Sequence, residues 1–279
     1  MKIRKLFSVL LIALLALSSV AALAAEIPAP EGDDNVIAIG ATEVPHAQII
    51  DNVVKPALEA AGWKVDLQVF NDYVIPNTSL EDGELDANYF QHLLYMQSEN
   101  ENRGLHLYPA KGVHLEPLGL FSEKIKSIDD LADGASISLP NDASNESRAL
   151  KLLADNGLIT LAEKDGLYEL SDITDNPHNY DLVELEAANT PNSLPDVDAA
   201  IINGNYALQR ELNPATDALV LESSDPNGNV FINYLVVRED NKDSLKTQAL
   251  VAAFSTQDVV DYIEANYSGS VIPAADLVE

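Results

Sequence analysis

The chain has 279 residues, of which 47% are hydrophobic, and a formal net charge of −29. So strong a negative charge argues against a phosphate backbone or an anionic membrane surface as a partner. The sequence contains no cysteine, which excludes disulfides, thiolate metal sites and cysteine nucleophiles together. A chain of this length and apolar content can bury one large core or the cores of two lobes.

The N-terminus has the pattern of a secretory signal peptide. Three cations within residues 2–5 precede an apolar run over residues 6–17, and the Ala-Leu-Ala of residues 22–24 fits the small-residue cleavage pattern. We therefore expect residues 1–24 to be a signal peptide and the protein to be exported to a periplasm or the cell envelope. A retained anchor is the alternative, but the apolar run is shorter than the ~20 residues that a membrane span needs. The Pro- and acid-rich residues 25–34 predict a linker.

Short apolar or alternating runs recur along the rest of the chain and predict strands. The clearest, residues 64–70, alternates polar and apolar side chains with period two. The other predicted strands cover residues 36–39, 135–139, 181–186, 199–202, 218–222 and 234–238. Helical patterns lie between several of them, over about residues 45–61, 143–156 and 244–267. This alternation predicts an α/β fold with open, mainly parallel sheets, in which ligands bind beyond the carboxyl ends of the strands.

Polar and aromatic side chains stand just after these strands, where such a fold places its ligand. The candidate ligand-binding residues are Tyr73, Tyr89, Phe90, His92, Arg148, Asn203 and Asn233. Arg148 offers a planar, two-pronged donor for a carboxylate, and the asparagines offer donors and acceptors without adding charge. The aromatic residues suit a flexible apolar or thioether side chain, because sulfur–ring contacts stabilise by about 0.3–1.5 kcal/mol. This chemistry matches a free amino acid such as methionine.

Each of these residues also has a purely structural interpretation. Taken singly, an arginine on a helix is more often part of a surface ion pair, an aromatic residue more often belongs to the core, and loop asparagines often form turns. Spacing alone therefore does not decide between binding and structure.

Patterns of catalysis and metal binding are weak in this sequence. It has no Gly-x-Ser-x-Gly motif, no Gly-rich phosphate loop and no His-Glu-x-x-His, so we expect no enzyme and no cofactor. The histidines lack close metal-ligand spacing, so that no metal site is expected; they are His46, His92, His106, His114 and His178. An exported enzyme acting on amino-acid derivatives is the main alternative, and an acidic envelope adhesin is a third.

Several motifs follow one another in a recognisable order between about residues 36 and 273. They are Gly40-Ala-Thr-Glu-Val-Pro-His46, Asp72-Tyr-Val-Ile-Pro-Asn77, Leu85-Asp-Ala-Asn-Tyr-Phe-Gln-His92, Val113-His-Leu-Glu-Pro-Leu-Gly-Leu120, Leu139-Pro-Asn-Asp142 with Asn145-Glu146 and Arg148-Ala-Leu150, and Ile202-Asn-Gly-Asn-Tyr-Ala207. In these motifs the chain resembles the NlpA family of methionine-binding lipoproteins, the substrate-binding components of ABC methionine importers.

The resemblance implies a two-lobe periplasmic-binding-protein fold, type II-like, with two crossover strands. Lobe one would comprise residues 35–120 plus 234–279, and lobe two residues 121–233. The implied function is to capture methionine or a closely related amino acid between the lobes and to deliver it to an ABC transporter permease. We expect a monomer, and another amino acid or a dipeptide stays open as the ligand.

Carried over position by position, the family's pocket gives each candidate a role. The side-chain wall would consist of Tyr73, Tyr89, Phe90 and His92, the carboxylate partner would be Arg148, and the other polar groups would belong to Asn203 and Asn233. The chain departs from the family at its N-terminus, where Ala-Leu-Ala-Ala stands in place of the lipobox cysteine. We therefore expect no lipid anchor at this position.

Overall fold

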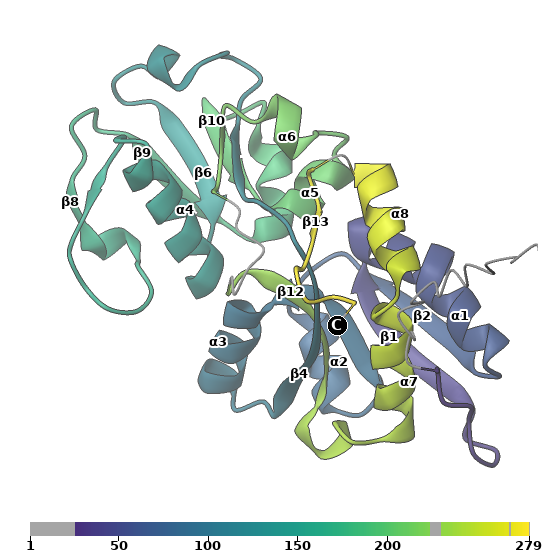
Figure 1. Ribbon diagram of the computed structural model, residues 1–279. Coiled ribbons are helices and arrows are strands. Elements are labelled where there is room, and N and C mark those ends of the chain that lie inside the picture. The colour runs from purple at the N-terminus through teal and green to yellow at the C-terminus, as the bar shows by residue number, and fades with distance from the viewer. Residues whose placement is uncertain (1–25, 224–229, 268, 279) are drawn as a thin grey trace, which may run out of the picture.

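The computed structural model describes residues 26–223, 230–267 and 269–278. The expected signal peptide, residues 1–24, lies outside the described residues. The described part forms two α/β lobes, each built on its own sheet (Figure 1). No helix within these ranges is long and apolar enough to cross a membrane.

The first lobe is built on a six-stranded sheet with the order β13-β4-β12-β3-β1-β2. Its strands are β1 (Val36–Thr42), β2 (Lys64–Phe70), β3 (Ala87–His92), β4 (Leu107–Leu115), β12 (Ile232–Arg238) and β13 (Ile272–Pro273). β1 pairs in parallel with β2 and β3, whereas β12 runs antiparallel between β3 and β4. The parallel pairing that the sequence predicts therefore holds for one half of this sheet, because β12 enters it from the other lobe.

The second lobe is built on a five-stranded sheet with the order β11-β5-β10-β6-β9. Its strands are β5 (Gly119–Phe121), β6 (Ser136–Pro140), β9 (Asp181–Leu185), β10 (Ala199–Ile202) and β11 (Val220–Leu221). β6 pairs in parallel with β9 and β10, and β5 runs antiparallel to β10 and β11. A separate two-stranded ribbon pairs β7 (Thr160–Leu161) with β8 (Ile173–Asp175).

The helices cover both faces of the sheets. They are α1 (Lys55–Ala60), α2 (Ile75–Glu81), α3 (Leu93–Arg103), α4 (Ala143–Asp155), α5 (Gly204–Gln209), α6 (Pro214–Asp217), α7 (Leu245–Phe254) and α8 (Gln257–Tyr267). Two π-helical turns, Glu43–Ala47 and Ile50–Val54, precede α1, and short 3₁₀ turns occupy Ile128–Asp130, Leu170–Asp172, Ala187–Asn189, Pro191–Ser193 and Glu239–Asn241. α1, α7 and α8 pack on one face of the first sheet, and α2 and α3 pack on the other.

Most predicted elements form, with two differences among the helices. β2 and β10 have the predicted bounds. The single helix predicted over residues 244–267 is two helices, because Ser255 leaves the helical conformation at φ −87° and ψ 40°. The helix predicted over residues 45–61 begins with the two π-helical turns and becomes α-helical only at α1.

The chain passes between the two sheets twice. Residues 116–118 join β4 to β5, and the return lies between β11 and β12, where residues 224–229 are outside the described ranges. The predicted lobe boundaries at residues 120 and 234 fall inside β5 and β12, because each change of sheet occurs just before these strands begin.

The described part of the predicted linker lies against the first lobe. Residues 26–34 form neither helix nor strand. The Trp63 indole donates a hydrogen bond to the carbonyl of Pro28 at 2.8 Å, and Asp34 pairs with Lys246 at 2.9 Å.

Each lobe has its own apolar core. In the first lobe Phe254 is fully buried, and its ring meets the edge of Tyr89 with 4.9 Å between centroids. In the second lobe Leu150 and Leu153 of α4 pack with Ile137 of β6. α4 begins at Asp142, whose carboxylate accepts the Asn145 N–H at 3.0 Å in the manner of an N-cap.

Replacement of Phe254 by alanine is expected to lower the free energy of unfolding by about 3–5 kcal/mol, because it opens a cavity in the core of the first lobe. Val69→Ala is the matched control, since Val69 is 50% exposed and should change stability by no more than about 0.5 kcal/mol. Urea unfolding followed by circular dichroism measures both. Equal losses in the two variants would contradict this description of the core.

Candidate functional site

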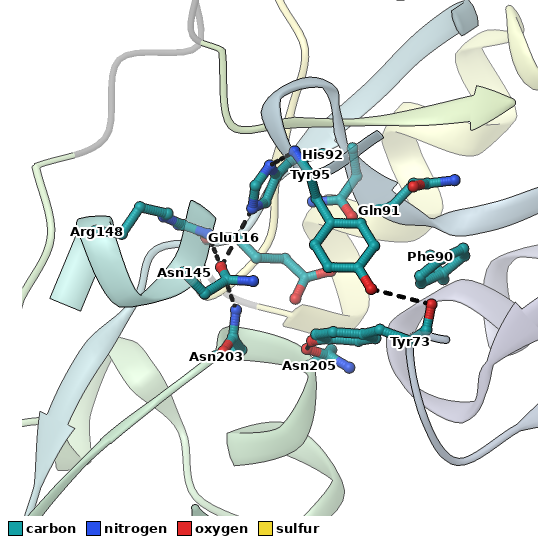
Figure 2. Close-up of a pocket in the computed structure, with 12 residues that line it drawn as sticks. Tyr73, Phe90, Gln91, His92, Tyr95, Glu116, Asn145, Arg148, Asn203 and Asn205 are labelled. Atoms are coloured by element: carbon teal, nitrogen blue, oxygen red, sulfur yellow. Dashed lines mark hydrogen bonds between the residues drawn. The ribbon is translucent and has the colours of Figure 1, made fainter. Parts of the chain in front are cut away.

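A cavity lies where the two lobes meet. Its lining comes from both lobes and consists of Tyr73, Phe90, Gln91, His92, Tyr95, Glu116, Asn145, Arg148, Asn203, Gly204, Asn205 and Asn233. Six of the seven residues singled out in the sequence are in this set. Figure 2 shows Tyr73, Phe90 and Tyr95 on one side of the cavity and Arg148 with Asn145 and Asn203 on the other.

Tyr89 is the exception and does not line the cavity. It is fully buried in the core of the first lobe, where its ring packs against Phe254 and His46. Its hydroxyl is hydrogen-bonded to His114. The assignment of Tyr89 to the side-chain wall is therefore corrected, because neighbouring residues of a strand point to opposite faces and Phe90 is the one that faces the cavity.

Aromatic rings form a continuous wall on the first-lobe side. Tyr73 lies 5.7 Å from both Phe90 and Tyr95 between ring centroids, and it stacks on Tyr206 of the second lobe at 4.9 Å. The hydroxyl of Tyr73 donates to Asn205 Oδ1 at 2.6 Å. The wall is thus apolar on its face while the tyrosine hydroxyls are satisfied by protein groups.

Asn145, in the first turn of α4, holds the polar side of the cavity together. Its Oδ1 accepts hydrogen bonds from Arg148 Nη1 at 3.1 Å, from His92 Nε2 at 3.2 Å and from Asn203 Nδ2 at 2.9 Å. Its amide nitrogen donates to the Asp142 carboxylate at 3.0 Å. The side chain is 1% exposed, so that these bonds fix its orientation in the absence of competing water.

The proton positions around Asn145 follow from its partners. Arginine can only donate, so Asn145 Oδ1 must accept, and the other two nitrogens must each carry a proton toward it. His92 Nδ1 accepts the backbone N–H of Tyr95 at 3.0 Å, which leaves its proton on Nε2. Burial, reinforced by the nearby Arg148 charge, lowers the pKa of His92 to about 3. His92 is therefore a neutral donor near pH 7.

The same reasoning leaves one acceptor in the cavity without a partner. Asn203 must turn its Nδ2 group toward Asn145, so its Oδ1 points away from that bond. Among the described residues, Asn203 Oδ1 is the buried side-chain oxygen or nitrogen that lacks a hydrogen bond. Such an atom is costly to bury and calls for a donor from outside the protein.

Arg148 is 4% exposed and is bound on several sides. Its Nε and Nη2 groups donate to the two Glu222 oxygens at 3.1 and 2.5 Å, and Nη2 also donates to the Glu116 carbonyl at 3.2 Å. Its guanidinium lies over the Phe231 ring, 4.3 Å from the centroid. With the bond to Asn145, four of its five N–H groups have partners among the described residues, and one on Nη1 has none there.

A buried cluster of two histidines and a carboxylate lies behind the polar side. Glu116 Oε1 is 2.6 Å from His114 Nε2 and 3.3 Å from His46 Nε2. His46 Nε2 also lies 3.1 Å from Asn233 Oδ1, an acceptor, so Nε2 carries the proton and Nδ1 accepts from the Thr42 hydroxyl. Burial lowers the pKa of His46 to about 4 and that of His114 to about 3, so both rings are neutral near pH 7.

These three residues are also the one group of potential metal ligands that the described residues bring together, within 4.8 Å. The sequence spacing gave no indication of it, because His46 and His114 lie on different segments of the first lobe. In this cluster His114 Nε2 is hydrogen-bonded to the carboxylate, while the His46 Nε2–H is directed at Asn233 Oδ1. Burial raises the pKa of Glu116, while its interactions with His46, Arg148 and the backbone N–H of Asn205 oppose that rise.

The model of the NlpA lipoprotein family matches residues 37–275. The chain belongs to the NlpA lipoprotein family. The family is one of substrate-binding proteins and is not an enzyme class.

Named relatives agree with this membership. The methionine-binding lipoprotein MetQ of Bacillus subtilis is 38% identical over 88% of this chain and 90% of its own length. The D-methionine-binding lipoprotein MetQ of Salmonella typhimurium is also 38% identical, over 87% of this chain and 89% of its own. A nutrient-binding protein of Burkholderia cenocepacia, solved bound to methionine, superposes with a TM-score of 0.81 at 39% identity, covering 85% of this chain and 99% of that one.

Sequence reasoning missed several lining residues. They are Gln91, Tyr95, Glu116, Asn145, Gly204 and Asn205. Tyr95 had a usable signal, since it lies one turn after His92, the residue that caps α3. Gly204 had none: a Cβ there would lie 2.9 Å from Glu116 Cβ and 3.2 Å from the Pro117 carbonyl oxygen. Only a glycine allows the second lobe to approach the Glu116 segment so closely.

The free energy of unfolding is expected to fall as the pH drops from about 6.5 toward 4. In this range the unfolded chain protonates His46, His92 and His114 while the folded protein does not, so stability is complete above the ordinary histidine pKa and is lost below it. Each such proton adds about 1.4 kcal/mol per pH unit to the slope. Glu116, with its raised pKa, acts in the opposite direction.

Urea unfolding between pH 7.5 and 5 measures this slope. His92→Gln should reduce it by up to one proton. A slope that is the same in wild type and His92→Gln would contradict the assignment of His92 as a neutral buried histidine.

Proposed function

We propose that the protein is the extracytoplasmic substrate-binding protein of an ABC importer, and that it captures methionine or a closely related amino acid between its lobes. The observation that carries this proposal is the cavity, in which an aromatic wall faces Arg148 and a set of asparagines. The family membership and the methionine-bound relative support the same ligand class. The permease of the importer is the partner in this proposal, and the protein acts as an exported monomer without catalytic activity.

The cavity offers a different environment to each part of an amino acid. Tyr73, Phe90 and His92 would contact the apolar side chain, and sulfur–ring contacts would favour a thioether. The remaining N–H of Arg148 would donate to the carboxylate. Asn203 and Asn233 would hold the other polar atoms; Asn233 Oδ1 accepts from His46, which leaves its amide N–H groups for another acceptor.

Ligand capture would be coupled to lobe closure. Residues 35–120 and 234–279 would act as one lobe and residues 121–233 as the other, joined by the two crossings. Bonds between them already exist: besides Tyr73 to Asn205, the Tyr206 hydroxyl donates to the Asn71 carbonyl at 3.3 Å. A ligand that contacts both lobes stabilises the closed form through those added contacts, and the closed form is what a permease would recognise.

A selective rise in melting temperature is expected when the mature chain, refolded free of carried-over ligand, is given methionine. A ligand at 100 times its Kd adds about 2.7 kcal/mol to the free energy of unfolding. The panel consists of the common amino acids, D-methionine and methionine-containing dipeptides. A rise with another amino acid or only with dipeptides would change the ligand, and no rise with any of them would contradict the proposed function.

Arg148→Ala is expected to weaken methionine binding by about 1.5–3 kcal/mol, the effect of losing a charge-assisted hydrogen bond. Isothermal titration calorimetry measures the loss. Arg103→Ala is the matched control, because Arg103 pairs with Glu99 on α3 outside the cavity and its removal should leave the Kd unchanged. An unchanged Kd in Arg148→Ala would remove this residue from the ligand site.

A further inference from the structure

Glu116 lines the cavity and is close enough to a bound ligand to contact it. It is 6% exposed and lies in the first crossing between the lobes. Figure 2 shows its carboxylate turned toward the middle of the cavity, between Asn203 and Tyr95. A buried carboxylate needs strong compensation, so its surroundings indicate which charge state the fold is built to hold.

The two histidines behind Glu116 supply part of that compensation, and the backbone N–H of Asn205 supplies more from the second lobe. His114 Nε2 is hydrogen-bonded to Oε1 at 2.6 Å, whereas His46 Nε2 lies 3.3 Å from Oε1 and directs its proton at Asn233 Oδ1. The carboxylate also accepts the backbone N–H of Asn205, and because a carboxylate has about four acceptor positions it can accept a further donor from the cavity. Neither histidine is cationic near pH 7 and burial raises the pKa of Glu116, so its ionised form needs a positive charge from the cavity side.

The charges in the cavity wall also favour a ligand that carries a positive charge. Arg148 is paired with Glu222 through two hydrogen bonds, which balances its charge. With Glu116 added, these three side chains sum to one negative charge. A ligand with only a carboxylate would raise the buried negative charge further, whereas a zwitterion brings a cation that offsets Glu116.

The lining contains a second acceptor, the side-chain oxygen of Asn203, that has no donor among the described residues. Asn203 Oδ1 is buried and lacks a hydrogen bond, and its orientation is fixed because Nδ2 donates to Asn145 at 2.9 Å. An anionic oxygen and an unpartnered amide oxygen in one lining fit a group with several N–H donors and a positive charge. A protonated amine has both properties, and a hydroxyl or keto group has neither.

We propose that Glu116, together with Asn203 Oδ1, binds the protonated α-amino group of the ligand and makes the site specific for free amino acids over their hydroxy, keto and N-acylated analogues. This inference rests on the proposed function and assigns to the site a determinant of ligand class. His46 and His114 are positioning residues in it, because they act on the ligand only through Glu116.

The test compares L-methionine with its 2-hydroxy analogue, 2-hydroxy-4-(methylthio)butanoate, by isothermal titration calorimetry. The two ligands share the carboxylate and the thioether and differ only at the amino group. Wild type should bind methionine at least about tenfold more tightly, and Glu116→Gln should lose most of that preference by weakening methionine alone. Glu146→Gln is the matched control: Glu146 is also buried but accepts the Leu170 N–H outside the cavity, so its ratio should equal that of wild type.

Each other outcome is decisive. Equal affinity of wild type for the two ligands overturns the proposal without any variant, even if Glu116→Gln fails to melt cooperatively. A folded Glu116→Gln with the wild-type ratio also overturns it, and would indicate that Glu116 is protonated and donates. Methionine affinity that rises with added zinc, falls with EDTA and is lost in Glu116→Gln would assign the cluster to a metal instead. If wild type binds no methionine, the proposed function fails first and this inference falls with it.

Discussion

The site depends on the hydrogen bonds that converge on Asn145 Oδ1. Three donors meet there, from His92 in one lobe and from Arg148 and Asn203 in the other. Because arginine can only donate, this single acceptor determines the proton position on His92 and the amide orientation of Asn203. The position of Asn145 is in turn held by the Asp142 carboxylate at the start of α4. A helix cap in the second lobe thus sets the polarity of the whole cavity.

The site also depends on buried histidines that are neutral near pH 7. His46 and His114 are buried beside a carboxylate, an arrangement that in water would favour imidazolium. Desolvation outweighs the attraction of Glu116 at His46, and burial lowers the pKa of His114. A neutral imidazole with a fixed tautomer is a directional donor without charge. It can therefore orient a carboxylate while leaving the negative charge available to a ligand.

The fold and much of the cavity could be predicted from local sequence patterns, and the failures have physical causes. Strands, caps and the residues that follow strands are local signals, which is why Phe90 and Asn203 were found. Tyr89 was misplaced because strand alternation was not applied within its motif. Glu116 and Asn145 also have partners 53 to 70 positions away, His46 for Glu116 and His92 for Asn145, which local patterns do not reveal. Only the fold brings those partners together.

The hydrogen bonds between the lobes have a cost for transport as well as a benefit for capture. Tyr73 to Asn205 and Tyr206 to Asn71 join the lobes through protein atoms alone. Each such bond raises the fraction of ligand-free protein that is already closed. The apparent Kd of the ligand falls as that fraction rises. Closed protein without ligand would also bind the permease and would compete there with ligand-loaded protein. The strength of these two tyrosine contacts therefore balances tight binding of a scarce ligand against unproductive binding of ligand-free protein to the importer.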